Sequence, residues 1–213
     1  MNDTSLLEDA LRTYLNRRCR RAYAHDLRNG MQGIFGGIDA LTRAARSTKP
    51  LTIPLDQLTQ FVQQAISNHE RGLERLLECM APERQPPAVV PLREMLTEQA
   101  HFMTNDTARH GIRVRLDFND DLKVFAARAR LQLIGLGLLT ESIDAMPSGG
   151  ELRIGGRTIG DRVHFEFIDS RTSPRPTSFV NEAVDRLVHE LSGQIEHLQS
   201  ATGCEVRVNL PTG

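Results

Sequence analysis

The feature that most constrains the fold is a proline-rich segment near the middle of the chain. Four prolines stand between residues 81 and 91: Pro82, Pro86, Pro87 and Pro91. Proline lacks the backbone N–H and clashes with the preceding turn, so a helix cannot continue through this segment, and an extended, stiff connector is favoured. The sequence before it has only helical patterns, whereas helical and strand patterns mix after it. We therefore predict a helical domain over residues 1–81, a linker over 82–91 and a mixed domain over 92–213.

The helical half predicts two long helices, one over residues 6–46 and one from about 54 to 80. Apolar residues of the first follow alternating spacings of four and three: Leu27, Met31, Ile34, Ile38 and Leu41. This spacing is typical of helices that pack side by side. A single helical hairpin would leave much of such an apolar stripe in water. Two hairpins that form a four-helix bundle would cover it, so we expect a homodimer.

The mixed half predicts an α+β sandwich with helices on one face of a mixed sheet. Its expected order is α-β-α-β-β-α-β-β. The expected helices lie over 92–110, 127–146 and 180–191, and the expected strands over 112–118, 151–157, 162–168, 194–198 and 205–210. The helix over 127–146 is expected to be strongly amphipathic. The strands on either side of Gly160-Asp161 are expected to form a hairpin.

Composition narrows the function classes. The formal net charge of -1 argues against general binding to nucleic acids or membrane surfaces. No apolar run approaches the roughly 20 residues needed to cross a bilayer, and the first residues do not read as a signal peptide. The three cysteines lie far apart without a CxxC spacing, which favours neither a zinc site nor a disulfide framework. We expect a cytoplasmic protein with reduced thiols.

A short motif in the first helix resembles the phosphoacceptor box of two-component sensor histidine kinases. That box reads His, acid, Leu, basic, then Asn or Thr, and usually Pro. Here the residues are His25, Asp26, Leu27, Arg28, Asn29 and Gly30. Five consecutive positions match and Gly30 replaces the proline. The resemblance implies a helical hairpin that dimerises as a four-helix bundle and carries a phosphoryl group on His25.

The mixed half resembles the ATP-binding domain of the same family. Residues 131–150 resemble its N-box helix and the following turn, and residues 183–210 resemble its last helix and hairpin. The family's two nucleotide-facing asparagines, one of which holds Mg²⁺, correspond to Gly137 and Glu141. Its DxGxG motif appears as residues 169–173, where only Asp169 is kept. Its second glycine box falls on residues 178–181. We therefore expect an α/β sandwich of the histidine-kinase ATPase type that does not bind ATP.

The resemblance then implies a histidine phosphotransferase rather than an ATP-dependent kinase. Near neutral pH the Nε2 atom of a histidine is a nucleophile, because the unperturbed pKa is about 6.5. Asp26 is expected to orient the imidazole of His25 or to accept its proton. Asn29 stands where the family has a residue that positions water for dephosphorylation, although it also suits a polar helix surface. No cofactor or metal site of the chain's own is expected, and the receiver domain would supply Mg²⁺.

The expected partners are receiver domains of response regulators and an upstream hybrid histidine kinase. Arg18, Arg21 and Arg28 share a helix face with His25 by their spacing. A basic rim there would complement the acidic pocket of a receiver, although an arginine-rich face is also typical of a solvated helix. Two alternatives stay open at this point. One is a non-catalytic module that binds a response regulator or a kinase, and the other is a divergent, active kinase.

Overall fold

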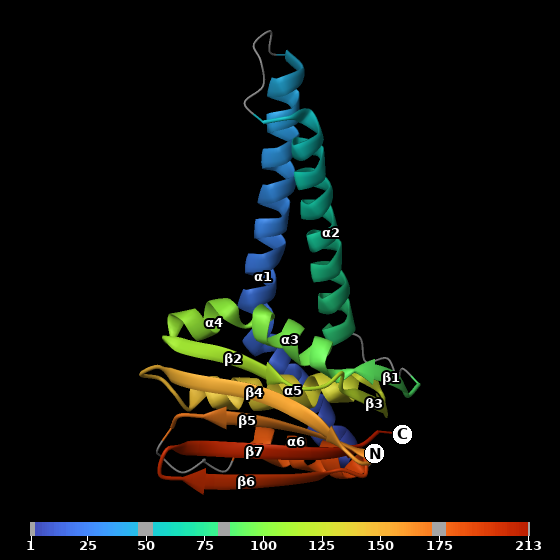
Figure 1. Ribbon diagram of the computed structural model, residues 1–213, viewed down its shortest axis with the longest axis vertical. Helices are drawn as coiled ribbons and strands as arrows, with labels where there is room; N and C mark the ends of the chain where they lie inside the picture. The colour runs from blue at the N-terminus through green and yellow to red at the C-terminus, as the bar shows by residue number, and fades with distance from the viewer. Residues whose placement is uncertain (1–2, 47–52, 81–85, 172–177, 213) are drawn as a thin grey trace. The chain divides into compact units, whose positions relative to one another are not determined.

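The computed structural model describes residues 3–46, 53–80, 86–171 and 178–212 (Figure 1). The chain divides into two compact units. We call them the α/β unit (Met1–Arg18 with Pro82–Gly213) and the two-helix unit (Cys19–Ala81). This division differs from the predicted one at the N-terminus, where residues before Cys19 belong to the α/β unit. The reason is that Leu11 and Leu15 are buried there.

The two long helices predicted from the first half are present. Helix α1 spans Asp3–Arg46 and α2 spans Leu55–Met80. Within the two-helix unit they pack closely along three glycines of α1. A Cβ atom at Gly30 would lie 2.7 Å from Nδ1 of His69, and one at Gly37 would lie 2.3 Å from Cγ2 of Val62. These glycines allow a close helix–helix contact that larger side chains would prevent.

Both helices of the two-helix unit leave large apolar side chains in water. We call this set the exposed apolar stripe: Met31, Phe35 and Ile38 of α1 with Ile66 and Leu73 of α2. Phe35 is 61% exposed and Ile38 is 47% exposed. Their spacings of three, four and seven residues put those of each helix on one face, and large exposed apolar side chains grouped in this way mark an interaction surface.

The α/β unit contains a mixed five-stranded sheet in the order β2-β4-β5-β7-β6. Its strands are β2 (Ile112–Phe118), β4 (Gly150–Ile159), β5 (Arg162–Asp169), β6 (Gln194–Ser200) and β7 (Gly203–Pro211). The β2–β4 pair is parallel and the other pairs are antiparallel. The predicted hairpin is confirmed, since β4 and β5 flank Gly160, whose φ of 62° suits a tight turn.

The helices lie on one face of this sheet, as predicted (Figure 1). They are α3 (Leu92–Phe102), α4 (Thr104–Arg109), α5 (Arg128–Asp144) and α6 (Phe179–Glu190). The single helix predicted over 92–110 is interrupted at Met103, which separates α3 from α4. The core lies between the layers, where alternate residues of β5 such as Val163, Phe165 and Phe167 are buried.

Helix α5 corrects one expectation. It is not amphipathic, because residues on nearly every side of it are buried. Gly135 faces Leu96 and Gln99 of α3, while Gly137 faces α6. A helix with neighbours on both flanks and a sheet below has no solvated face to display. The apolar sequence of α5 follows from this central position.

The predicted linker is only partly a linker. Residues 82–85 lie outside the described part of the chain, but β1 (Ala88–Pro91) pairs with β3 (Lys123–Ala126) in a small antiparallel sheet. Val90 is buried opposite Val124 in this pair. The segment is therefore extended, as its prolines require, yet its end belongs to the α/β unit.

Candidate functional site

The predicted phosphoacceptor box lies on helix α1, whose backbone is helical throughout residues 24–29. The side chains of Arg21, His25 and Asp26 lie outside the described part of the structure. Those of Arg28 and Asn29 are described and exposed. The roles of His25, Asp26, Arg21 and Arg28 therefore stay predictions.

Asn29 borders a hollow of about 460 Å³ between α1 and α2. Gly30 and His69 line the same hollow. Nδ1 of His69 is buried and has no hydrogen-bond partner among the described residues. The sequence indicated only that His69 belongs to the apolar spacing of α2. The structure brings this imidazole beside the helix turn that follows the predicted phosphoacceptor.

Arg18 has partners that the sequence did not indicate. Its guanidinium forms ion pairs with Asp106 at 2.6 Å and with Asp144 at 2.7 Å, both within the α/β unit. Burial of Arg18 lowers its pKa, but the two carboxylates outweigh that effect and hold the pKa above its ordinary value. Arg18 is thus held by two carboxylates of its own unit, and its predicted contact with a receiver stays a prediction.

A second candidate site is the part of the α/β unit where the resemblance places a nucleotide. We call it the nucleotide face, defined by Gly137, Glu141, Asp169 and the start of α6. Asp169 is buried and accepts hydrogen bonds from the side chain of Arg171, at 2.7 Å from Nε and also from Nη2. The one residue of the DxGxG motif that this chain keeps is therefore bound by an arginine two residues later.

Gly137, which corresponds to the family's first nucleotide-facing asparagine, is packed too tightly for a larger side chain. A Cβ atom at Gly137 would lie 2.7 Å from Cγ2 of Val184 and 3.5 Å from Cγ1 of Val180. Helix α6 therefore packs directly against α5 at this point. An asparagine side chain would need more room than this contact leaves.

The residues that correspond to the family's second glycine box form the N-terminal cap of helix α6. Ser178 is the N-cap residue of α6, and its Oγ accepts a hydrogen bond from the backbone N–H of Asn181 at 3.1 Å. Serine is a favoured residue at this position because it satisfies a backbone donor that the helix leaves unpaired. The residues thus serve helix formation where the family's glycines serve a nucleotide.

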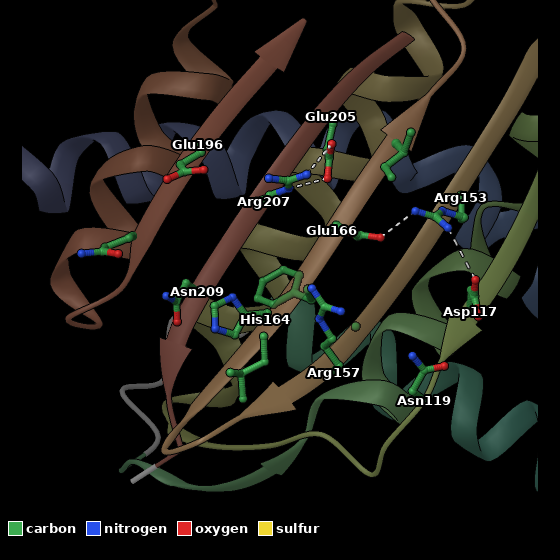
Figure 2. A pocket seen from close by; sticks show the side chains of 15 residues that line it. Asp117, Asn119, Arg153, Arg157, His164, Glu166, Glu196, Glu205, Arg207 and Asn209 are labelled. Atoms are coloured by element: carbon green, nitrogen blue, oxygen red, sulfur yellow. Dashed lines mark hydrogen bonds and ion pairs between the residues drawn. The ribbon is translucent and has the colours of Figure 1, made fainter. Parts of the chain in front are cut away.

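The opposite face of the sheet is open and carries a hollow of about 640 Å³ (Figure 2). Figure 2 shows Arg153 between Asp117 and Glu166, with Arg207 bound to Glu205. Paired charges of both signs alternate across this face. It is therefore not a surface of one strong charge that selects an oppositely charged partner.

The pKa of His164 tests the electrostatics of this sheet face. Partial burial lowers its pKa below the ordinary 6.5, and the nearby Arg157 and Arg162 lower it further. The folded state then binds this proton less tightly than the unfolded state, so protonation below about pH 6.5 opposes folding. We expect an NMR titration midpoint below 6.5 that rises in Arg157→Gln and is unchanged in Arg207→Gln. An unchanged midpoint in Arg157→Gln contradicts this account.

Two kinds of feature are absent from the described residues. Among them, no helix has the length and hydropathy to cross a membrane. The same part of the chain holds no cluster of three or more histidine, cysteine, aspartate or glutamate side chains able to bind a metal ion.

Comparisons with known proteins identify the fold. No protein-family model matches the chain, and no curated protein sequence matches it. Solved structures do. The catalytic domain of histidine kinase ThkA is 17% identical, covers 60% of this chain and 97% of its own length, and gives a TM-score of 0.56. Histidine kinase AdeS of Acinetobacter baumannii is 14% identical to this chain. The match covers 89% of this chain and 98% of the AdeS chain, with a TM-score of 0.55.

A further solved structure is histidine kinase ThkA in complex with the response regulator protein TrrA. It is 18% identical, covers 100% of this chain and 67% of its own, and gives a TM-score of 0.55. At these identities the likeness shows the fold alone. The chain therefore has the fold of a histidine kinase core, with the ATPase-type sheet and helices in the α/β unit.

Proposed function

We propose that this chain is a histidine phosphotransferase that carries a phosphoryl group on His25 between receiver-domain aspartates and does not use ATP. The observation that supports it most is the state of the nucleotide face. Asp169 is buried against Arg171, and Gly137 is packed against Val184. A nucleotide would have to displace a buried ion pair and separate two packed helices, which costs far more than filling an open pocket.

The proposed transfer is a displacement at phosphorus. The lone pair on Nε2 of His25 attacks the phosphorus of a phosphorylated receiver aspartate. The N–P bond forms as the P–O bond breaks, and the aspartate leaves as a carboxylate, so the leaving group needs no proton. Asp26 would hold the proton on the other ring nitrogen. Rate then depends mainly on positioning and charge neutralisation, with Mg²⁺ supplied by the receiver.

The proposed partners follow from the same reasoning. The ThkA structure has a response regulator bound to a protein of this fold. Arg28 is exposed on the helix that carries His25. Arg21 precedes His25 by one helical turn in the same helix. A receiver would meet these cations with its acidic pocket. The exposed apolar stripe supports a homodimer, in which two copies bury it as a four-helix bundle.

A divergent, active kinase is the alternative that the fold itself favours, and nucleotide binding separates the two. We expect the purified full chain to show no ATP binding by calorimetry at millimolar ATP with Mg²⁺, and no labelling by radioactive ATP. When it is mixed with a phosphorylated receiver, label should move to the chain within minutes. Labelling by ATP alone would restore the kinase, and no transfer in either reaction would favour the non-catalytic binding module.

A further inference from the structure

The nucleotide face is covered by the start of helix α1, residues 3–18, which we call the N-terminal segment. Leu11 and Leu15 stand one helical turn apart and are 0% and 2% exposed. Leu11 reaches the position that the resemblance assigns to a nucleotide-facing asparagine, since its Cδ1 lies 4.0 Å from where a Cβ of Gly137 would be. Side chains at i and i+4 share one face of a helix, so these leucines form a single apolar ridge.

Aromatic and polar contacts of Tyr14 and Arg18 also hold this segment. The ring of Tyr14 stacks edge-on against Phe179 of α6, with centroids 5.2 Å apart. Its hydroxyl donates to Asp144 of α5 at 3.4 Å. Burial and the nearby Asp144 raise the pKa of Tyr14, so this hydroxyl keeps its proton at neutral pH. Arg18 reaches the same Asp144 and also Asp106.

The other end of the segment is held by a second set of charges. Glu8 lies 3.4 Å from Arg130 near the start of α5, and Arg130 lies 3.1 Å from Glu190 at the end of α6. Contacts near residue 8 thus fall at the start of α5, and contacts near residue 18 at its end. The segment runs along α5 in the same direction.

We propose that the nucleotide face has become a helix-binding groove and that residues 3–18 of this chain are its resident ligand. The mode is that of an amphipathic helix in a groove, with apolar anchors at i and i+4. The groove selects a helix with a glutamate three residues before the first leucine and an arginine three residues after the second. This proposal is independent of phosphoryl transfer, since it involves neither His25 nor a receiver.

The first test removes one end contact from the full chain. In Arg18→Gln the ion pairs with Asp106 and Asp144 are lost, and the amides of residues 4–18 should exchange hydrogen about tenfold faster. The matched control is Arg17→Gln, which changes the neighbouring exposed arginine and should leave exchange unchanged. Equal exchange in the unaltered chain and Arg18→Gln would overturn the proposal.

The second test supplies the segment in trans. The full chain with Leu11→Asp and Leu15→Asp should release its own segment and bind a fluorescent peptide of residues 3–20, measured by anisotropy. The unaltered chain should not bind that peptide, because its groove is filled. A folded double variant that ignores the peptide, or an unaltered chain that binds it equally well, contradicts the proposal. Should the double variant fail to fold, the exchange comparison decides.

Discussion

We expect His25→Ala to abolish phosphoryl uptake from a phosphorylated receiver and to leave the proposed dimer intact. The substitution removes the nucleophile that the proposal names, so uptake should fall by roughly a thousandfold or more, as when other enzymes lose their nucleophile. The structure places position 25 inside the continuous helix α1, where alanine is the best helix former. The helix is therefore kept, and the loss would report chemistry rather than folding.

The measurement is transfer of radioactive phosphate to the chain, read on a gel under alkaline conditions that preserve phosphohistidine. His101→Ala is the matched control, because His101 is an exposed histidine of α3 in the other unit. It should take up phosphate at the unaltered rate. Uptake by His25→Ala would place the carrier elsewhere and make the box match coincidental. Equal loss in His101→Ala would mean that the fold, and not a nucleophile, is being measured.

We expect Ile38→Glu combined with Ile66→Glu to convert the proposed homodimer into monomers. Both residues belong to the exposed apolar stripe, at 47% and 39% exposure in the single chain. Full burial of one such side chain contributes about 1.5–3 kcal/mol, and a dimer would bury the part of each that is still exposed, which is less than half. Four of them then contribute on the order of 3–5 kcal/mol, and the variant loses this contribution when all become charged. A loss of that size weakens a micromolar dimer by about a hundredfold or more.

Sedimentation velocity measures the outcome. Gln32→Glu with Gln60→Glu is the matched control, because it adds the same charges at exposed polar positions of the same two helices. The control should remain a dimer. A dimer that persists in the Ile38→Glu, Ile66→Glu variant would show that the stripe is not the interface. An unaltered chain that sediments as a monomer would refute the bundle altogether.

Local pattern was enough to predict most elements of the chain. The spacing of apolar residues placed both long helices within a few residues of their ends, because a helix repeats every 3.6 residues whatever it packs against. Alternation and the Gly160-Asp161 turn placed the β4–β5 hairpin. The substitutions at Gly137 and Arg171 were also visible in the sequence, as departures from the resemblance at positions where the family binds a nucleotide.

What fills the nucleotide face was decided only by the tertiary structure. Arg18 binds Asp144 across 126 residues of sequence, and Tyr14 meets Phe179 from the far half of the chain. The spacing of Leu11 and Leu15 indicates an apolar helix face. It does not identify the residues that cover this face, because periodicity shows which side of a helix is buried and not which element it packs against. The same holds for the β1–β3 pair and for α5, whose burial depends on neighbours from distant segments. Local periodicity determines elements, whereas long-range packing determines which surfaces they cover.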